Sequence, residues 1–386
     1  MVATGTARAT KVEGFTDYCA MTLTSIHRSI YLAMAMLQTG LQTFNCPMVG
    51  LGTWLSSQGQ VGQAVDWALE AGVRLIDTAY MYQNEKEIGD ALKKWFDSGK
   101  LKRSDLFIVT KLPPMGMKAS NVEKYLKKSL EALQLSYVDL YLIHCPFGLK
   151  EDDNSVNFKF REGAQVIIET DDHVALWHQM ERMFDLGLTK SIGVSNFSSS
   201  QIDRIMDIAR IRIAVNQVEC YAYWQQKNLR KTMEKYGIKL MAYGPLGSPG
   251  RPSQVFKGTL PAVLQDPVVT TIAQKWNKTP AQVLLRHLLQ LGFIVIPKSV
   301  NEARIKENSQ VLDFNLCNED MVILNGLDRG IKGRTFLFDV FPTDKDATKE
   351  PEYPFNDERD NYSMFDVQEA GDGKSPSEKD TSSAAN

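Results

Sequence analysis

The sequence lacks the features that mark several classes of protein. Its 386 residues include 44 basic and 46 acidic side chains, which leaves a formal net charge of only −2. No basic stretch with interleaved aromatic residues occurs, so we expect no nucleic-acid partner. Cysteine is scarce, and its five residues are widely spaced, at Cys19, Cys46, Cys145, Cys220 and Cys317. This usage is typical of reduced thiols in a cytoplasmic protein and predicts neither a disulfide framework nor a bound metal.

A long hydrophobic run is also missing. The apolar stretch "SIYLAMAMLQTG" at 29–40 is too short to span a bilayer and starts too late for a signal peptide. We therefore predict no membrane association. Basic residues near the N-terminus leave a mitochondrial presequence open, although Glu13 and Asp17 argue against it. We expect 1–43 to be an untargeted, poorly ordered extension, and 366–386 to be a disordered tail because it has no apolar periodicity.

What is present is a repeated alternation of short apolar runs with amphipathic segments between residues 48 and 330. The runs predict strands at 48–54, 73–79, 106–112, 138–145, 190–196, 213–220, 238–244 and 293–299. Several segments between them end in glycine, as helices often do. Eight βα units over about 280 residues match a TIM barrel in number and size. We predict an α/β fold, a (β/α)₈ TIM barrel with an N-terminal β-hairpin and C-terminal rim loops, over 44–365.

A doubly wound sheet with a dinucleotide-binding fingerprint is the alternative fold. That fingerprint requires G-x-G-x-x-G between the first strand and its helix. Gly50 and Gly52 supply the first two glycines, but Leu55 stands where the third is needed. The sequence therefore favours the barrel.

Polar and aromatic side chains gather at the ends of the predicted strands. They are Trp54, Asp77, Lys111, His144, Ser195, Asn196, Gln217, Glu219, Tyr243 and Lys298. A buried polar group costs free energy unless it finds a partner. In a barrel the C-terminal strand ends meet at one rim, where active sites lie, so we expect these residues to converge.

Three of these positions, Asp77, Lys111 and His144, together with Tyr82 five residues after Asp77, suggest chemistry. A tyrosine loses its proton near pH 10, but an ammonium beside Tyr82 would lower that pKa, and Lys111 is the available cation. Asp77 would supply the anion that keeps a buried Lys111 charged. His144 would donate a hydrogen bond that positions a carbonyl oxygen. No serine or cysteine nucleophile is paired with a histidine, so a hydride from a cofactor is the simplest attacking group.

Each residue also has a purely structural interpretation. Asp77 could cap a turn, Tyr82 could be exposed, Lys111 could be an ordinary strand-end cation and His144 a satisfied core histidine. Their occurrence on successive strands of one barrel favours the shared site.

Two segments suggest a binding site for a nucleotide. "AYGPLGSPG" at 242–250 is a loop that could bring backbone N–H groups to a pyrophosphate, and Tyr243 offers a flat face for a nicotinamide. "IPKSVNEARIKEN" at 296–308 places Lys298 and Arg304 around a helix start, which suits the 2′-phosphate of NADPH. A plain turn and a solvated helix start remain the alternatives.

These motifs resemble the aldo-keto reductase family over about residues 44–356. The motifs are "GLGTW" (50–54), "LIDTAYMYQNEKEIG" (75–89), "LYLIHCP" (140–146), "GVSNF" (193–197), "NQVEC" (216–220), "AYGPLGSP" (242–249) and "IPKSV" (296–300). The resemblance implies that Asp77, Tyr82, Lys111 and His144 form a catalytic tetrad, with Tyr82 as proton donor. It also implies NADPH or NADP⁺ as cofactor, an aldehyde or ketone as substrate and a monomeric protein.

The resemblance assigns further residues to binding. Ser195, Asn196 and Gln217 would hold the carboxamide, Tyr243 would stack on the nicotinamide, and Leu246 and Ser248 would lie along the pyrophosphate. Lys298, Ser299, Val300, Asn301 and Arg304 would surround the 2′-phosphate, with Glu307 and Asn308 facing the adenine. Thr53, Trp54 and Gly244 complete the expected cofactor contacts, and the expected substrate pocket consists of Trp54, Tyr82, His144 and Cys145.

A histidine at 144, where steroid double-bond reductases have glutamate, favours carbonyl reduction. A structural or regulatory use of an NADPH-binding barrel, as in channel β-subunits or lens crystallins, is the competing function. Cys145 replaces a frequent tryptophan and predicts a roomier pocket that could admit steroids. Leu55 and Gly250 cannot form the lysine–aspartate latch of some relatives, which predicts faster cofactor release. We expect 148–172 and 330–365 to be rim loops that shape specificity.

Overall fold

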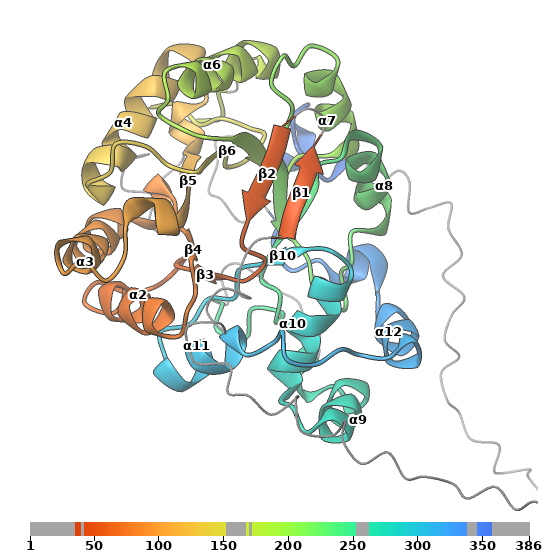
Figure 1. The fold of residues 1–386 in the computed structure, drawn as a ribbon. Helices are drawn as coiled ribbons and strands as arrows, with labels where there is room; N and C mark the ends of the chain where they lie inside the picture. The colour runs from red at the N-terminus through yellow and green to blue at the C-terminus, as the bar shows by residue number, and fades with distance from the viewer. Residues whose placement is uncertain are drawn as a thin grey trace, which may run out of the picture.

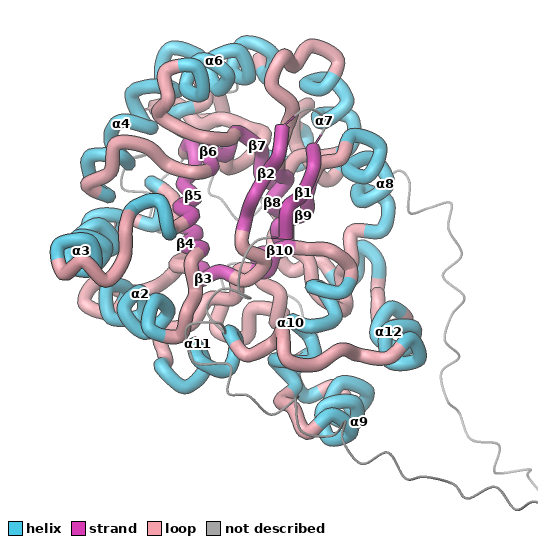
Figure 2. The backbone as a smooth tube through the Cα atoms, viewed as in Figure 1, coloured by secondary structure: helices cyan, strands magenta, loops and turns pink. Residues whose placement is uncertain are grey.

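The computed structural model describes residues 35–39, 42–151, 167–169, 172–251, 262–337 and 346–356. Its centre is a sheet of eight parallel strands in the order β10-β9-β8-β7-β6-β5-β4-β3, surrounded by helices (Figures 1 and 2). The strands are β3 (Gly50–Gly52), β4 (Leu75–Asp77), β5 (Phe107–Leu112), β6 (Leu140–Ile143), β7 (Ile192–Ser195), β8 (Val215–Glu219), β9 (Lys239–Tyr243) and β10 (Ile294–Val295). Each lies within a predicted strand, and the predicted TIM barrel is confirmed.

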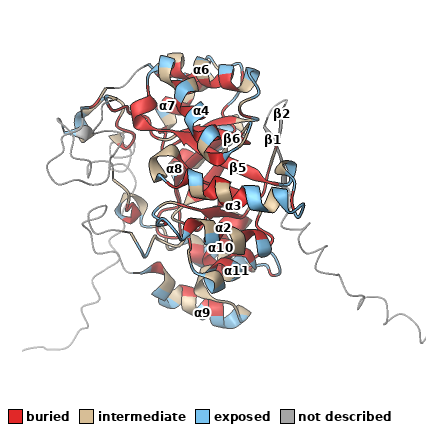
Figure 3. Ribbon diagram, turned by 90° about the vertical axis from the view of Figure 1, so that its left-hand side faces the viewer, coloured by how far each residue is buried: buried red, intermediate tan, exposed pale blue. Residues whose placement is uncertain are grey.

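The helices lie outside the strands. They are α2 (Val61–Glu70), α3 (Glu85–Asp97), α4 (Val122–Leu133), α6 (His173–Asp185), α7 (Ser199–Met206), α8 (Lys227–Tyr236), α9 (Pro267–Trp276), α10 (Pro280–Gln290), α11 (Glu302–Ser309) and α12 (Asn318–Asn325). Their inward faces are buried and their outward faces are exposed (Figure 3). No helix in the described ranges has the length and hydrophobicity needed to cross a membrane.

The two edge strands meet through backbone contacts. The Gly52 N–H donates to the Pro297 carbonyl (3.1 Å), and the Val295 N–H donates to the Met48 carbonyl (2.9 Å). A Cβ on Gly52 would lie 2.7 Å from the Ile296 carbonyl oxygen, so only glycine permits this approach. The barrel is therefore joined between its first and last strands.

An antiparallel hairpin, β1 (Ala35–Thr39) and β2 (Gln42–Cys46), covers the N-terminal end of the barrel (Figure 1). Phe44 and Cys46 are buried in one apolar cluster with interior strand residues such as Leu75 and Val109. The hairpin was predicted, but β1 lies within the segment assigned to the extension, so regular structure begins before residue 44. Residues 1–34 and the predicted tail at 366–386 lie outside the described ranges.

Alternation along the strands decides which side chains enter the barrel. In β5, Phe107 and Val109 belong to the interior cluster, whereas Ile108 and Leu112 pack in the outer cluster with the helices. Successive strand residues point to opposite faces, so Lys111 continues the interior row of Val109. Asp77 likewise follows Leu75 on β4. The barrel thus directs both charged side chains inward at its C-terminal end.

Candidate active site

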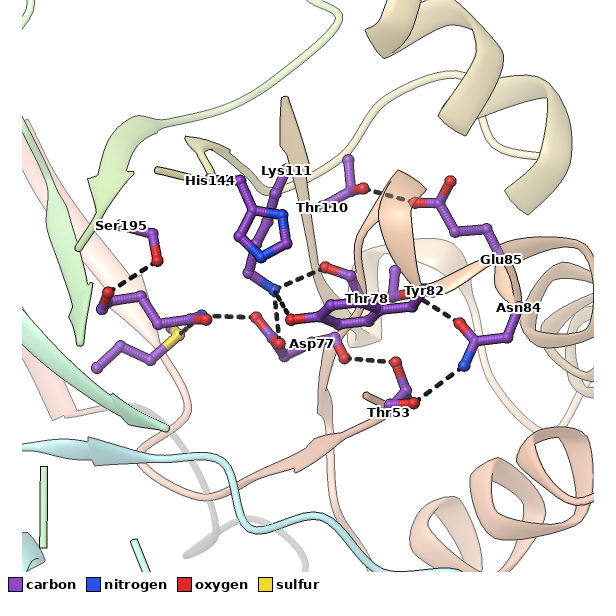
Figure 4. A network of polar contacts seen from close by, with 12 residues as sticks. Thr53, Asp77, Thr78, Tyr82, Asn84, Glu85, Thr110, Lys111, His144 and Ser195 are labelled. Atoms are coloured by element: carbon purple, nitrogen blue, oxygen red, sulfur yellow. Dashed lines mark hydrogen bonds and ion pairs between the residues drawn. The ribbon is translucent and has the colours of Figure 1, made fainter. Parts of the chain in front are cut away.

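Lys111 is the centre of a buried polar network at the C-terminal ends of β4 and β5 (Figure 4). Its ammonium donates to Asp77 Oδ1 (2.7 Å), to the Thr78 carbonyl (2.8 Å) and to Tyr82 Oη (3.2 Å). Its side chain is 0% exposed and that of Asp77 is 3% exposed. A buried charge needs a partner and further hydrogen bonds, and Lys111 has both.

Tyr82 reaches this network from the 3₁₀ turn Tyr80–Tyr82 that follows β4. The next residues fix that turn to the barrel wall: Asn84 donates to the Thr53 carbonyl (2.9 Å), and Thr110 donates to the buried Glu85 carboxylate (2.5 Å). Both contacts appear in Figure 4. Sequence reasoning did not single out Asn84 and Glu85, although "QNE" directly after Tyr82 is a helix-start pattern that could have identified them.

His144 follows β6, and its ring lies 5.7 Å from the Tyr82 ring, nearly perpendicular to it at 75°. In the described part of the chain its Nδ1 is buried and has no hydrogen-bond partner. Burial, and secondarily the Lys111 charge, hold the pKa of His144 well below its usual range. The imidazole is therefore neutral at pH 7 and keeps one N–H to donate.

The electrostatics of the tyrosine differ from expectation. Burial raises the pKa of Tyr82 well above 10, with a smaller contribution from Asp77, so the expected lowering by Lys111 is wrong for this structure. The reason is that the Asp77 carboxylate offsets the Lys111 charge while the phenol loses water. Burial also lowers the pKa of Lys111 and raises that of Asp77, and the attraction between the two opposes both shifts. Tyr82 is consequently protonated at neutral pH.

The residues expected to bind the carboxamide form a second network beside the first. Asn196, at a left-handed φ of 63°, donates to the His144 carbonyl (3.0 Å) and accepts from the Tyr243 hydroxyl (2.9 Å). Ser195 donates to the Gln217 carbonyl (2.8 Å), and the Gln217 amide donates to Asp77 Oδ2 (2.7 Å). The structure therefore links this group of residues to Lys111 through Asp77.

Trp54, half-buried after β3, and Tyr243, at the end of β9, both contact the ring of Phe336. Phe336 was not predicted individually, because nothing in its local sequence distinguishes it within the rim segment. Thr53 is buried and binds the Asp77 carbonyl through its hydroxyl (2.9 Å).

The glycine-rich loop after Tyr243 turns tightly. Gly244 has a φ of 60° and Ser248 a φ of 50°, and the Gly247 N–H donates to the Gly244 carbonyl (2.9 Å). Leu246 is partly buried against the apolar core. The loop begins beside the carboxamide network, because Tyr243 belongs to both.

The residues expected around the 2′-phosphate lie at the start of α11. Lys298 and Arg304 are exposed, and neither side chain has an ion-pair partner among the described residues. Asn301 caps the helix by accepting the Arg304 N–H (3.0 Å), and Ser299 is buried beside it and accepts the Asn301 N–H (3.1 Å). Val300 packs on the barrel core. Two unpaired cations thus flank a helix N-terminus, which is a favourable place for an anion.

The residues expected at the adenine, unlike Lys298 and Arg304, are engaged in contacts within the protein. Glu307 accepts a hydrogen bond from the Thr279 hydroxyl (2.5 Å), and Asn308 is buried under the barrel edge near Val49 and Ser309. Both residues therefore lie on α11, as expected, but Glu307 is engaged in a hydrogen bond and Asn308 is buried within the protein.

Comparison with known proteins identifies the architecture. The model of the Aldo/keto reductase family matches residues 48–329. Aldo-keto reductase family 1 member A1-A of Danio rerio is 43% identical over 313 residues, covering 80% of this chain and 95% of that protein. Dihydrodiol dehydrogenase 3 of Bos taurus is 39% identical over 317 residues, covering 81% and 95%. The chain belongs to the aldo-keto reductase family.

A solved structure agrees. The aldose reductase of Schistosoma japonicum superimposes with a TM-score of 0.74 at 40% identity, covering 84% of this chain and 98% of that one. This aldo-keto reductase is therefore an oxidoreductase that acts on carbonyl groups of small molecules, in a family that uses nicotinamide cofactors.

At position 145 of this aldo-keto reductase, where a roomier pocket was expected, aromatic residues pack against the cysteine. Cys145 is 4% exposed and packs in one cluster with Phe147, Tyr353 and Phe355. The C-terminal segment 346–356 therefore supplies aromatic rings next to the position where a tryptophan is absent. In the insertion at 148–172, Leu149 pairs with Ile168, and residues 152–166 and 170–171 lie outside the described residues.

The latch positions lead to a kinetic prediction. Leu55 is exposed, a methyl group on Gly250 would meet no atom of the described residues within 4 Å, and neither residue is charged. Introducing Leu55→Lys together with Gly250→Asp should slow NADP⁺ release, because an ion pair between these two loops would have to break first. Stopped-flow fluorescence of the double variant and of Leu55→Lys alone measures this. Equal release rates in wild type and double variant would contradict the prediction.

Proposed function

We propose that this protein reduces aldehydes or ketones to alcohols with NADPH, and that Tyr82 donates the proton to the carbonyl oxygen. The observation that carries the proposal is the position of the Lys111 ammonium, which contacts both Asp77 and the Tyr82 hydroxyl in a buried site. This arrangement holds a neutral phenol next to a fixed positive charge.

The residues then have distinct roles. The raised pKa keeps the proton on Tyr82 until an alkoxide develops, and Lys111, 3.2 Å away, stabilises the phenolate as that proton leaves. Asp77 keeps Lys111 charged in a site that otherwise favours its neutral form. His144, neutral at pH 7, donates the hydrogen bond that orients the carbonyl oxygen beside Tyr82.

The cofactor would supply the hydride. The residues present fit NADPH: Tyr243 offers a ring at the barrel mouth, the 244–248 loop turns tightly through the left-handed Gly244 and Ser248, and two cations without ion-pair partners among the described residues flank the capped start of α11. Ser195, Asn196 and Gln217 would bind the carboxamide. We further propose a monomer in the cytoplasm, on the basis of the family and of four cysteines in the described residues, Cys46, Cys145, Cys220 and Cys317, that form no disulfide.

Lys298 and Arg304, the two cations at the start of α11, lead to a prediction about the preference for NADPH over NADH. Lys298→Met or Arg304→Met should weaken NADPH binding about 10- to 100-fold while leaving NADH nearly unchanged, because only NADPH carries the 2′-phosphate. Fluorescence titration with each cofactor measures this. Lys306→Met is the matched control, since Lys306 lies on the same helix but pairs with Glu302 (2.5 Å). Equal weakening of both cofactors would rule out the assignment.

The experiment that tests the function is an assay of aldehydes, sugars, ketosteroids and quinones with NADPH. Reduction of at least one class, dependent on Tyr82, supports the proposal. Binding of NADPH without turnover of any class would favour the structural or regulatory alternative.

A further inference from the structure

Glu219, the last residue of β8, has a buried carboxylate that takes no part in the chemistry above. It is 1% exposed and accepts the backbone N–H of Thr335 on both oxygens (3.1 and 3.0 Å) and that of Phe336 on Oε2 (3.1 Å). The Thr335 hydroxyl also donates to it. Charge-assisted bonds from three donors hold the segment firmly to the end of a barrel strand.

The chain just before Thr335 is fixed to the loop after β8 as well. The Tyr221 hydroxyl donates to the Gly333 carbonyl (2.6 Å). A Cβ on Gly333 would lie 2.0 Å from the Tyr223 carbonyl oxygen, so the backbones approach as closely as glycine allows. The position of Phe336 is therefore set by β8 and its loop.

Phe336 stands between the two aromatic residues of the proposed site. Its ring centroid lies 5.5 Å from that of Trp54 and 5.3 Å from that of Tyr243, with interplanar angles of 65° and 87°. Edge contacts of this kind are favourable but weak. They orient the ring, whereas the Glu219 bonds hold the backbone that carries it. Phe336 is only partly buried and its ring contacts both Trp54 and Tyr243, which places it at the barrel mouth.

We propose that Glu219 is a positioning residue that fixes Phe336 as a wall of the substrate opening, and that this wall disfavours wide carbonyl compounds. The proposal rests on the proposed carbonyl reductase function and adds a limit on substrate width. Loss of the carboxylate removes the hydrogen bonds that hold the backbone of Phe336. The ring then moves away from Trp54 and Tyr243, and wider substrates can enter the substrate opening. Tyr82, Lys111 and His144 are not touched by Glu219, so the chemistry at the tetrad is retained.

The test compares propanal with 1-naphthaldehyde at saturating NADPH. Phe336→Ala should raise the ratio of kcat/KM for naphthaldehyde to that for propanal about tenfold. Glu219→Gln, which keeps the shape but replaces one acceptor oxygen by an amide donor, should raise the ratio in the same direction by about threefold or more. Thr335→Val, which keeps both N–H bonds, should have a smaller effect than Glu219→Gln.

Glu181→Gln is the matched control. Glu181 is also a buried carboxylate that accepts a backbone N–H, from Ile211 (2.8 Å), but it lies on α6. The Glu181→Gln variant should have a lower midpoint of thermal unfolding but the same ratio of kcat/KM for naphthaldehyde to that for propanal. An unchanged ratio in Phe336→Ala and Glu219→Gln, or an equal shift in Glu181→Gln, would overturn the proposal.

Hydrogen exchange separates this proposal from the proposed function. In Glu219→Gln the amides of Thr335 and Phe336 should exchange about tenfold faster or more, whether or not any aldehyde is reduced. If wild-type protein reduces neither aldehyde, the proposed function fails. If those two amides exchange equally slowly in wild type and variant, the positioning role of Glu219 fails.

Discussion

Replacing Tyr82 by phenylalanine should lower kcat for aldehyde reduction by about 10³-fold or more, while NADPH binds as tightly as before. The substitution removes only the hydroxyl that accepts the Lys111 hydrogen bond and that we propose as the proton donor. No other hydroxyl is found in the described network around Lys111 that could replace it, because Thr78 contacts the ammonium through its carbonyl. Steady-state turnover and fluorescence titration with NADPH measure the two quantities separately.

Tyr80→Phe is the control for this variant. Tyr80 lies on the same 3₁₀ turn, but its ring packs against Tyr125, with centroids 5.0 Å apart, away from Lys111. Its loss of a hydroxyl should leave kcat within about twofold of the wild type. A Tyr82→Phe enzyme that retained turnover within tenfold of the wild type would exclude Tyr82 as the proton donor.

Replacing Lys111 by methionine should abolish measurable turnover and reduce the free energy of unfolding by about 3–5 kcal/mol. The variant leaves Asp77 buried with an uncompensated negative charge, since Lys111 is its ion-pair partner at 2.7 Å. The remaining Gln217 amide bond, at 2.7 Å, does not replace a charge. Urea denaturation gives the stability change.

The loss of unfolding free energy in Lys111→Met should depend on pH in a definite direction. Burial already raises the pKa of Asp77, and without Lys111 the opposing attraction is gone. A carboxyl whose folded pKa exceeds its unfolded value destabilises the fold increasingly as the pH rises through and above about 4. The deficit of Lys111→Met relative to wild type should therefore be largest near neutrality and shrink toward pH 4.

The double variant Asp77→Asn/Lys111→Met separates stability from catalysis. It removes both buried charges, so it should recover most of the lost unfolding free energy but none of the turnover. A double variant as unstable as Lys111→Met alone would show that the destabilisation comes from lost packing of the lysine chain and not from the unpaired carboxylate.

The sequence was sufficient to predict the barrel and the convergence of Asp77, Tyr82, Lys111 and His144, because both depend on local patterns. Apolar runs of strand length alternated with helical periodicity eight times, and each run contained an observed strand. Asp77 and Lys111 were recognisable because a charge that ends an apolar strand is unusual and requires a partner. Parallel strands bring their C-terminal ends to one rim, so the convergence of these residues followed from the topology.

Contacts between distant parts of the chain were decided only by the tertiary structure. Phe336 reaches Trp54 and Tyr243, and Tyr353 and Phe355 cover Cys145, across sequence separations that no local pattern encodes. The pKa of Tyr82 depends on how far burial and the Asp77 charge outweigh Lys111, which requires three-dimensional distances. The sequence thus determined which chemical groups stand at the barrel mouth. The folded structure determined the polarity and width of the space between them, because both depend on how water and distant side chains are excluded from it.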